Sequence, residues 1–319
     1  MMEIIFGLTE LKRTLVNPVV TLGNFDGVHL GHQMIFEKVK EEASKVQGEA
    51  VVITFEPHPL KVLSPSRCPP LLTPFRTKMI LIEKSGMDTV VCLQFTRTFA
   101  ELPAFEFVRG VLVEKVKARR VVVGYNYHFG KGKEGNVETL KRVGKTLDVD
   151  IEVIGPLTIG GVLVSSSKIR DLIREGNVEK ASSLLGRDYL ILGRVIEGAR
   201  RGRTLGFPTA NLKISEELHP KPGVYAAGVV WNRQSFDGVV NVGWNPTFQP
   251  GQEEPGRISV EVYMLDFNQQ IYGDEIQVSF KKRIRDEIRF DSPSELIAQI
   301  KKDVQWAREK VFGKTNPHP

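Results

Sequence analysis

The sequence has only two cysteines, Cys68 and Cys92, and neither stands in a CxxC or comparable spacing. This scarcity excludes a disulfide scaffold and argues against a cysteine-based metal or redox motif. The first residues, Met1 to Phe6, lack a basic flank followed by a long apolar stretch, and no later run approaches the length that spans a bilayer. These absences predict a cytoplasmic protein with no membrane partner.

The sequence also lacks a long basic arm and an aromatic-rich RNA motif, although its formal net charge is +6. Because lysines and arginines are scattered among acidic residues, we expect no nucleic-acid partner and favour small phosphorylated ligands. With 319 residues, the chain exceeds what one hydrophobic core usually serves, so two domains are expected.

The first part of the chain, from Val19 to about Leu185, alternates short β-branched runs with longer amphipathic ones. This alternation predicts βαβ units and a parallel sheet, whose binding crevice lies at the carboxyl ends of the strands. The predicted strands are 19–22, 50–55, 89–93, 120–123 and 150–154, and the clearest predicted helices are 98–117 and 137–147.

After Gly186 the pattern changes to strand-like runs broken by glycine, proline and asparagine, which predicts an antiparallel barrel or sandwich. The predicted strands are 189–195, 224–231, 238–242, 258–265 and 275–280. We therefore expect one domain over residues 1–186 and a second over 187–319. A last helix should begin after Ser292 as N-cap, with Pro293 at its first position, and dock on the barrel.

The most informative segment is Gly23–His32, where a strand should lead into a helix. A helix start offers unpaired N–H groups and partial positive charge to an anion, and His29 and His32 would add donors to the same anion. Gly27 and Gly31 permit a tight turn and a close approach of ligand. The alternative is that both histidines lie on the surface of an ordinary loop, but the joint spacing favours the anion site.

Three further segments end predicted strands. Glu56–Pro59 should border the same crevice. Val123–Gly130 places Asn126 and aromatic faces where a base or flavin ring could stack, although a structural aromatic cluster explains it equally well. Gly130–Gly135 matches GxGxxG, but its distance from the strand and its two lysines favour a flexible basic loop over a dinucleotide fingerprint.

A second helix start follows at Ser165–Arg170. Its hydroxyls can cap the helix, and Lys168 and Arg170 can face an anion at its positive end. Capping alone accounts for the serines, but two such helix starts on one sheet strengthen the case for a polyphosphate ligand.

In the second half, Gly198–Asn211 is rich in glycine and arginine and ends in two oxygen-bearing side chains. Glycine amides and arginines suit phosphate, while the oxygens of Thr209 and Asn211 suit Mg²⁺. In the strand 258–265, Glu261 lies off the apolar face. It is either a solvated glutamate or, beside a phosphate loop, a base for an attacking alcohol.

The phrases GNFDGVHLGHQ, FEPHP, VGYNYHFG and SSSKIR, in this order, resemble the FMN adenylyltransferase module of prokaryotic bifunctional riboflavin kinase/FAD synthetases, with its Rossmann-like nucleotidylyltransferase fold. The resemblance implies that His29 and His32 contact the ATP phosphates and that Asn126 helps to position substrate. Ser167 stands where the family usually has threonine, and many relatives have aspartate in place of Asn126.

The phrase from Gly198 to Asn211 and the strand around Glu261 resemble the riboflavin kinase module of the same family, an antiparallel barrel with a terminal helix. The resemblance implies that Glu261 is the general base, that Thr209 and Asn211 bind Mg²⁺, and that Arg285 and Phe290 lie beside the flavin. Relatives often carry histidine where this chain has Tyr263. A surface ion pair is the structural alternative for Arg285.

Together these patterns predict a bifunctional enzyme that uses ATP to phosphorylate riboflavin to FMN and then adenylylates FMN to FAD. Alternatives are an adenylyltransferase for another substrate, a nucleic-acid-binding module and a nicotinamide oxidoreductase. The predicted catalytic residues are Glu261, His29, His32 and Asn126, and the predicted contacts for ATP and its phosphates are Gly23, Phe25, Gly31, Ser165, Ser166, Ser167, Arg170, Gly198, Arg203 and Gly206.

Overall fold

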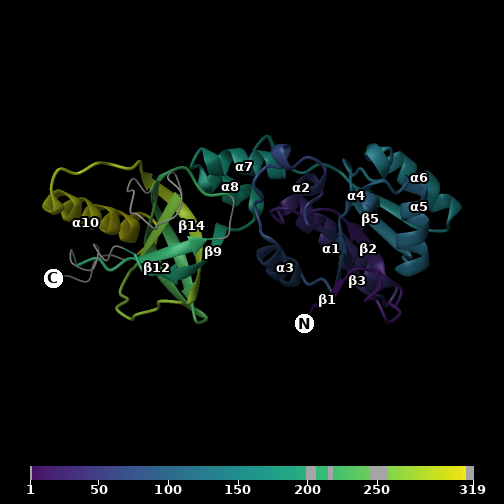
Figure 1. Ribbon diagram of the computed structural model, residues 1–319, viewed down its shortest axis with the longest axis horizontal. Helices are drawn as coiled ribbons and strands as arrows, with labels where there is room; N and C mark the ends of the chain where they lie inside the picture. Colours follow the sequence, from purple (N-terminus) through teal and green to yellow (C-terminus); the bar gives the residue numbers. More distant parts are fainter. Residues whose placement is uncertain (1, 199–205, 215–217, 245–257, 314–319) are drawn as a thin grey trace. The chain divides into compact units, whose positions relative to one another are not determined.

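The protein forms two compact units in a computed structural model that describes residues 2–198, 206–214, 218–244 and 258–313 (Figure 1). The sheet unit is Met1–Ser166 and the barrel unit is Ser167–Pro319. By this division the helices α7 (Ser166–Arg174) and α8 (Val178–Leu185) group with the barrel. The functional boundary expected at 186/187 stays a prediction.

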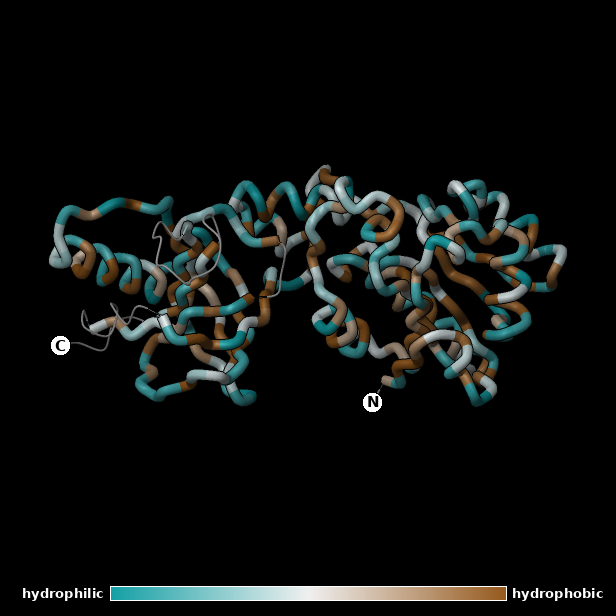
Figure 2. The backbone as a smooth tube through the Cα atoms, viewed as in Figure 1, coloured by the Kyte–Doolittle hydropathy of each residue, from teal (hydrophilic) through white to brown (hydrophobic). Residues whose placement is uncertain are grey.

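The sheet unit is built on six parallel strands in the order β1-β4-β3-β2-β5-β6. The central strands are buried on both faces and read as apolar runs, which is typical of a parallel sheet covered by helices (Figure 2). Their bounds are β1 (Glu3–Phe6), β2 (Val19–Leu22), β3 (Ala50–Glu56), β4 (Thr89–Gln94), β5 (Arg120–Gly124) and β6 (Asp150–Ile154).

All five predicted strands of this half are present, whereas β1 was not expected because its four residues have only one buried side chain. The connecting segments include a short hairpin of β7 (Thr158–Ile159) and β8 (Val162–Leu163). The main helices are α1 (Leu30–Lys45), α2 (Pro59–Leu63), α3 (Phe75–Lys84) and α6 (Val137–Thr146).

The single helix expected over 98–117 is wrong, because the chain breaks after α4 (Arg97–Ala100) and continues from α5 (Ala104–Glu106) directly into a π-helix, η2 (Phe107–Lys115). Pro103 lies between α4 and α5, and proline cannot supply the N–H that a continuous helix needs there. Two short 3₁₀ turns, η1 (Pro65–Arg67) and η3 (Lys131–Lys133), complete the unit.

The barrel unit closes six antiparallel strands in the order β10-β13-β12-β11-β14-β9. A two-residue turn with positive φ at Asn232 and Arg233 joins β11 to β12. The strands are β9 (Tyr189–Ile196), β10 (Ala210–Ile214), β11 (Gly223–Trp231), β12 (Gln234–Trp244), β13 (Ile258–Met264) and β14 (Glu275–Arg285). Closure confirms the barrel and excludes the sandwich.

The last helix, α10 (Pro293–Lys310), begins where the sequence predicted. Ser292 accepts a hydrogen bond from the Glu295 N–H at 3.3 Å, and Pro293 occupies the first helical position. Val304, Ala307 and Val311 pack against an apolar cluster that includes Val239 of the barrel. The helix therefore covers part of the outer surface of the barrel.

Candidate functional sites

The sheet places its binding crevice between β2 and β5. After β2 the chain continues to β3 and β4 on one side, then crosses to β5 on the other side of β2, so the order of strands reverses there. Ligands of such sheets bind beyond the carboxyl ends of the strands at this point. Gly23–His32 follows β2 and Asn126 follows β5, so the topology brings both predicted segments to the same edge.

His29 and His32 form one stacked pair at the N-terminus of α1. Their ring centroids are 3.6 Å apart and their planes differ by 17°. His29 is the N-cap residue, and its Nδ1 accepts the backbone N–H of His32 at 3.3 Å, so the neutral ring carries its proton on Nε2. That proton is the donor a phosphate oxygen needs.

Aromatic packing holds the His32 ring in place. The Phe25 ring meets it edge-on with centroids 5.2 Å apart and also contacts Phe36. A Cβ on Gly23 would lie 3.0 Å from the Phe25 ring, and one on Gly31 would lie 3.3 Å from the His29 ring. Phe25 is itself 3% exposed, so its ring is a support for His32 and only its backbone can reach a ligand.

The loop that leads to the histidines is tied down by Asp26. Its carboxylate accepts the backbone N–H groups of Leu72 and Thr73 at 3.1 and 3.0 Å. The Asp26 carbonyl accepts the Ser166 hydroxyl at 2.8 Å. Because Asp26 anchors the loop, the left-handed φ angles of Phe25, Gly27 and Val28, between 41° and 88°, are held in place.

Asn126 is exposed at the end of β5, and its side-chain oxygen lies close to Gly124 and to Ile35 of α1. A Cβ on Gly124 would be 3.5 Å from both the Asn126 Oδ1 and the Ile35 side chain. The amide therefore lies on the α1 side of β5.

Tyr127 and Phe129 stack on each other with centroids 5.5 Å apart, and Phe129 is buried, so this pair belongs to the core.

The GxGxxG segment does not have the context of a dinucleotide fingerprint. Phe129 and Gly135 pair with each other in an isolated bridge, and helix α6 begins only after Asn136 caps it. Lys131 pairs with Glu101 at 2.7 Å on the surface. In the Glu56–Pro59 segment, His58 caps α2 by accepting the Leu60 N–H at 3.2 Å.

The second predicted helix start is α7, which begins at Ser166. Ser165 and Ser166 are half-buried, Ser167 is exposed and Arg170 is 7% exposed. The hydroxyl of Ser166 is engaged with the Asp26 carbonyl rather than with its own helix. Ser166, the last residue of the sheet unit, is thus bonded to the loop that carries the histidines.

A groove of about 600 Å³ runs along α1 from Leu30, the residue after His29, and the charged side chains of Glu37, Lys38 and Glu41 line its far part. The first turns of α1 form one wall with Leu30, Gln33 and Met34, and the segment after β6 forms the other with Leu157 and Ile159. Gln33 donates its amide to the Val28 carbonyl at 2.8 Å, which fixes the end of the groove next to the histidines. A flat apolar group could lie here while an attached phosphate reaches the start of α1.

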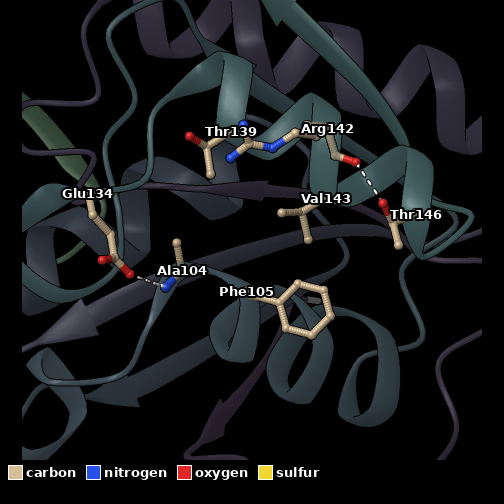
Figure 3. Close-up of a pocket in the computed structure, with 7 residues that line it drawn as sticks. All are labelled: Ala104, Phe105, Glu134, Thr139, Arg142, Val143 and Thr146. Carbon is tan, nitrogen blue, oxygen red and sulfur yellow. Dashed lines mark hydrogen bonds between the residues drawn. The ribbon is translucent and has the colours of Figure 1, made fainter.

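A second cavity, of about 440 Å³, lies between α5 and α6 and contains none of the predicted residues (Figure 3). Its wall includes Phe105, Thr139 and Arg142, and the Glu134 carboxylate at its edge accepts the Ala104 N–H at 2.8 Å.

In the barrel, Glu261 lies in the middle of β13 between two asparagines on neighbouring strands. The register pairs Glu261 with Asn211 of β10 and with Asn241 of β12. Directly opposed residues of antiparallel strands project to the same face. Val260 and Val262 are buried while Glu261 is half-buried, which confirms that the carboxylate leaves the core face.

Of the groups predicted to bind metal and phosphate, Asn211 pairs with Glu261 across the strands and Gly198 lies against Asn211. A Cβ on Gly198 would collide with the Asn211 amide, so only glycine allows that side chain to lie against the backbone. Thr209 is half-buried at the start of β10, and Gly206 is exposed with φ +82°. Arg203 lies outside the described residues.

Tyr263, two residues beyond Glu261, packs edge-on against Phe207 with centroids 5.4 Å apart. Burial raises the pKa of the Tyr263 hydroxyl. The aromatic pair connects β13 to the segment that leads to Thr209.

Arg285 is engaged with α10. It forms two-pronged hydrogen bonds to Asp303 at 2.7 to 3.0 Å, and it donates to the Asp286 carbonyl at 2.9 Å. The Asp303 side chain is 4% exposed, so this is not the surface ion pair given as the alternative. The guanidinium also lies 6.0 Å from the Phe290 ring, so both predicted flavin contacts lie together.

Two residues near these sites were not predicted. Asn241 is a polar residue between Val240 and Val242, and this alternation was its only signal in the sequence. Lys78 is buried on α3 among apolar positions, and its spacing from Phe75 and Ile82 could have indicated an unusual lysine on the core face.

His29 and His32, at a helix start where the strand order reverses, suit nucleotidyl transfer. Glu261, in a strand beside oxygen donors, suits phosphoryl transfer. The fold and these sites therefore define a two-module transferase that uses nucleotides. A family model for FAD synthetase matches residues 11–168, and one for riboflavin kinase matches residues 185–311. The chain belongs to the bifunctional riboflavin kinase/FMN adenylyltransferase family. It phosphorylates riboflavin to FMN and adenylylates FMN to FAD, with ATP as co-substrate.

Relatives named as bifunctional riboflavin kinase/FMN adenylyltransferases match along nearly the whole chain. The protein of Escherichia coli (strain K12) is 38% identical over 99% of this chain and 100% of its own length. That of Listeria monocytogenes is 39% identical over 94% of this chain and 95% of its own. A solved structure titled as a macrolide-efflux protein from Streptococcus pneumoniae has a TM-score of 0.87 and 33% identity, covering 96% and 99% of the two chains.

None of the helices in the described residues is both long and apolar enough to cross a membrane. The same residues contain no cluster of three or more histidine, cysteine or acidic side chains placed to hold a metal ion.

Proposed function

We propose that the sheet unit carries out adenylyl transfer with His29 and His32, and that the barrel unit carries out phosphoryl transfer with Glu261. The stacked histidine pair on the N-terminus of α1 is the observation that carries this assignment. The ranges matched by the two family models support the same division. The expected boundary at 186/187 belongs to this proposal.

In the sheet unit, a phosphate oxygen of FMN attacks the α-phosphorus of ATP, and the bond to the β-phosphate breaks to release pyrophosphate. Negative charge grows on the leaving pyrophosphate, and donors preorganised at the helix start offset it. Ser165 and Ser166 hold the triphosphate, while Asn126 orients the substrate from β5, and the roles of Ser167 and Arg170 stay predictions. The backbone of Gly23, Phe25 and Gly31 lets ATP approach closely.

The apolar end of the groove along α1, which begins at Leu30, is the place for the adenine ring. Leu30 directly follows His29, so a base between Met34 and Leu157 leaves its phosphates at the histidine pair. A nucleobase is flat and largely apolar, and the groove offers facing apolar side chains from two segments.

In the barrel unit, the riboflavin 5′-hydroxyl attacks the γ-phosphorus of ATP while Glu261 takes its proton, and ADP leaves. Gly198, Arg203 and Gly206 form the phosphate loop, and Arg285 and Phe290 border the flavin. The hydroxyl of Thr209 and the amide oxygen of Asn211 are the hard donors that Mg²⁺ prefers, and Gly198 makes room for that amide. Bound with ATP, Mg²⁺ would neutralise phosphate charge.

Labelled ATP tests the assignment directly. With Mg²⁺ and riboflavin, label in the γ-phosphate should enter FMN, and label in the α-phosphate should enter only FAD. Removing the metal with a chelator should stop phosphorylation of riboflavin. Entry of α-label into a product formed without the sheet-unit histidines would refute the assignment. A cytoplasmic location and the absence of nucleic-acid or membrane partners stay predictions.

A further inference from the structure

A buried lysine lies beneath the loop that leads to the histidine pair. Lys78, on α3, is only 6% exposed, although an ammonium group is costly to remove from water. The Lys78 Nζ donates to the Asn24 carbonyl at 3.3 Å and to the Thr54 Oγ1 at 3.2 Å. It therefore bonds the loop after β2 to the end of β3, at the edge of the sheet where the chemistry takes place.

Three titratable groups on neighbouring elements surround this ammonium. The Lys78 ammonium interacts electrostatically with Asp26 in the loop, Glu56 at the end of β3 and Cys92 on β4. The Phe75 ring lies 5.9 Å from the Lys78 Nζ. Burial lowers the pKa of Lys78, and the surrounding acids oppose that shift. The nearby acidic groups and the two hydrogen-bond acceptors offset the cost of burying the Lys78 ammonium.

The contact with Asn24 fixes the orientation of one peptide group. In a trans peptide the C=O and the following N–H point in opposite directions. Because the Asn24 carbonyl points to Lys78, the Phe25 N–H points away from it. Within the part of the chain that the structure describes, that N–H has no protein acceptor, and Phe25 has the left-handed φ of +49° that places backbone donors in anion-binding loops.

We propose that Lys78 is a positioning residue for adenylyl transfer, holding the Asn24–Phe25 peptide so that the Phe25 N–H donates to the phosphate chain beside His29 and His32. This inference rests on the proposed function of the sheet unit. Lys78 does not touch the reacting atoms, and it acts through the peptide that it orients.

The test compares Lys78→Met with Lys84→Met in the full-length protein. The two lysines lie on the same helix and the change is identical, but Lys84 is exposed. Lys78→Met should lower kcat for FMN adenylylation roughly 10- to 100-fold, since small misplacements of donors have effects of this size. Riboflavin phosphorylation should not change, and Lys84→Met should leave both reactions unchanged.

A kinetic comparison separates positioning from loss of folded protein. Because the donor acts on developing charge, kcat should fall more than KM for ATP changes, and Lys78→Arg should recover part of the loss. Equal losses in both reactions, or a Lys78→Met rate within about twofold of the unchanged protein, would overturn the proposal. Failure of the unchanged protein to convert FMN would instead refute the proposed function.

A second variant decides the question if Lys78→Met does not fold. Thr54→Val is nearly isosteric and keeps the buried charge, but it removes one of the two acceptors that orient the ammonium. A fall in adenylylation kcat of about threefold or more, with riboflavin phosphorylation unchanged, supports the proposal. An unchanged kcat overturns it.

Discussion

The sheet unit carries its candidate groups in a loop and at a helix start, whereas the barrel unit carries them in the middle of strands. His29 and His32 are three residues apart in the chain, and the helix itself brings them together. Glu261, Asn211 and Asn241 come from three strands and meet only through the register of the sheet. A local site tolerates change elsewhere, while a site built by register depends on the whole barrel.

The largest expected effect is on the barrel side of this comparison. Glu261→Gln keeps the shape of the side chain but removes its ability to accept a proton, so FMN formation should fall about 10²- to 10⁴-fold. Added FMN should still be converted to FAD. Chromatography of the flavins after incubation with ATP measures both steps, and loss of both steps in a folded variant would contradict the separation of the sites.

The matching change in the sheet unit is His32→Ala. Loss of a preorganised donor at developing charge should slow FAD formation about 10²- to 10³-fold while FMN still accumulates. The same chromatographic assay measures FAD formation, and FMN formation in the same sample is its internal control. If FAD continued to form at the original rate, the histidine pair would not be the adenylylation site.

The ion pair between Arg285 and Asp303 tests how far the barrel depends on distant contacts. Asp303→Asn leaves the Arg285 charge without its partner and should lower the free energy of unfolding of the barrel unit by roughly 3 kcal/mol. All three tryptophans lie in this unit, so urea unfolding followed by tryptophan fluorescence reports on it: Trp231, Trp244 and Trp306.

Asp286→Asn is the control for that measurement. Its carboxylate pairs with Arg283 at 2.7 Å but is 69% exposed, so the loss should stay below about 1 kcal/mol. Equal losses of unfolding free energy for the two variants would show that burial does not increase the contribution of the Arg285–Asp303 pair to stability.

Asn241→Ala tests the idea of a site built by register. It removes one of the two amides at the register positions opposite Glu261. Because such an amide can donate to the carboxylate, we expect FMN formation to fall about tenfold. FAD formation from added FMN should not change. An unchanged rate of FMN formation would mean that Glu261 is oriented by other contacts.

The smallest expected effect is the acid response of the sheet unit. Hydrogen bonds from Lys45 and Lys38 and the charge of Arg120 lower the pKa of the Glu42 carboxyl to about 2. A lowered pKa stabilises the folded state above the ordinary pKa near 4.5, and this stabilisation is lost as the pH falls toward 2.

Amide hydrogen exchange along α1 measures this acid response. Glu42→Gln should reduce the extra protection at neutral pH and flatten its decline in acid. Glu41→Gln, on the same helix but 62% exposed, should change neither. A Glu42→Gln profile that matches the unchanged protein would contradict the assignment of the stabilisation to this carboxylate.

The contrast between the units also explains what the sequence could predict. The strands of the sheet were predictable because parallel strands buried on both faces are continuous apolar runs, as in 50–55. The histidine pair was predictable because an N-cap and its first turn are adjacent in sequence.

Register was not predictable in the same way. The sequence showed that Glu261 leaves the apolar face of its strand, but nothing local specified that Asn241 would lie opposite it. The strand β10 was missed because its residues Ala210–Ile214 have only one buried side chain, and it is recruited by pairing with β9 and β13. The prediction of one helix over 98–117 was wrong because it followed the apolar spacing and did not include the break at Pro103.

The most direct test of two separable sites is complementation. His32→Ala should convert riboflavin only to FMN, and Glu261→Gln should leave riboflavin unchanged, but an equimolar mixture of the two variants should produce FAD because FMN released by one can be used by the other. A mixture that makes no FAD, although each variant is folded and retains its predicted single activity, would contradict the account.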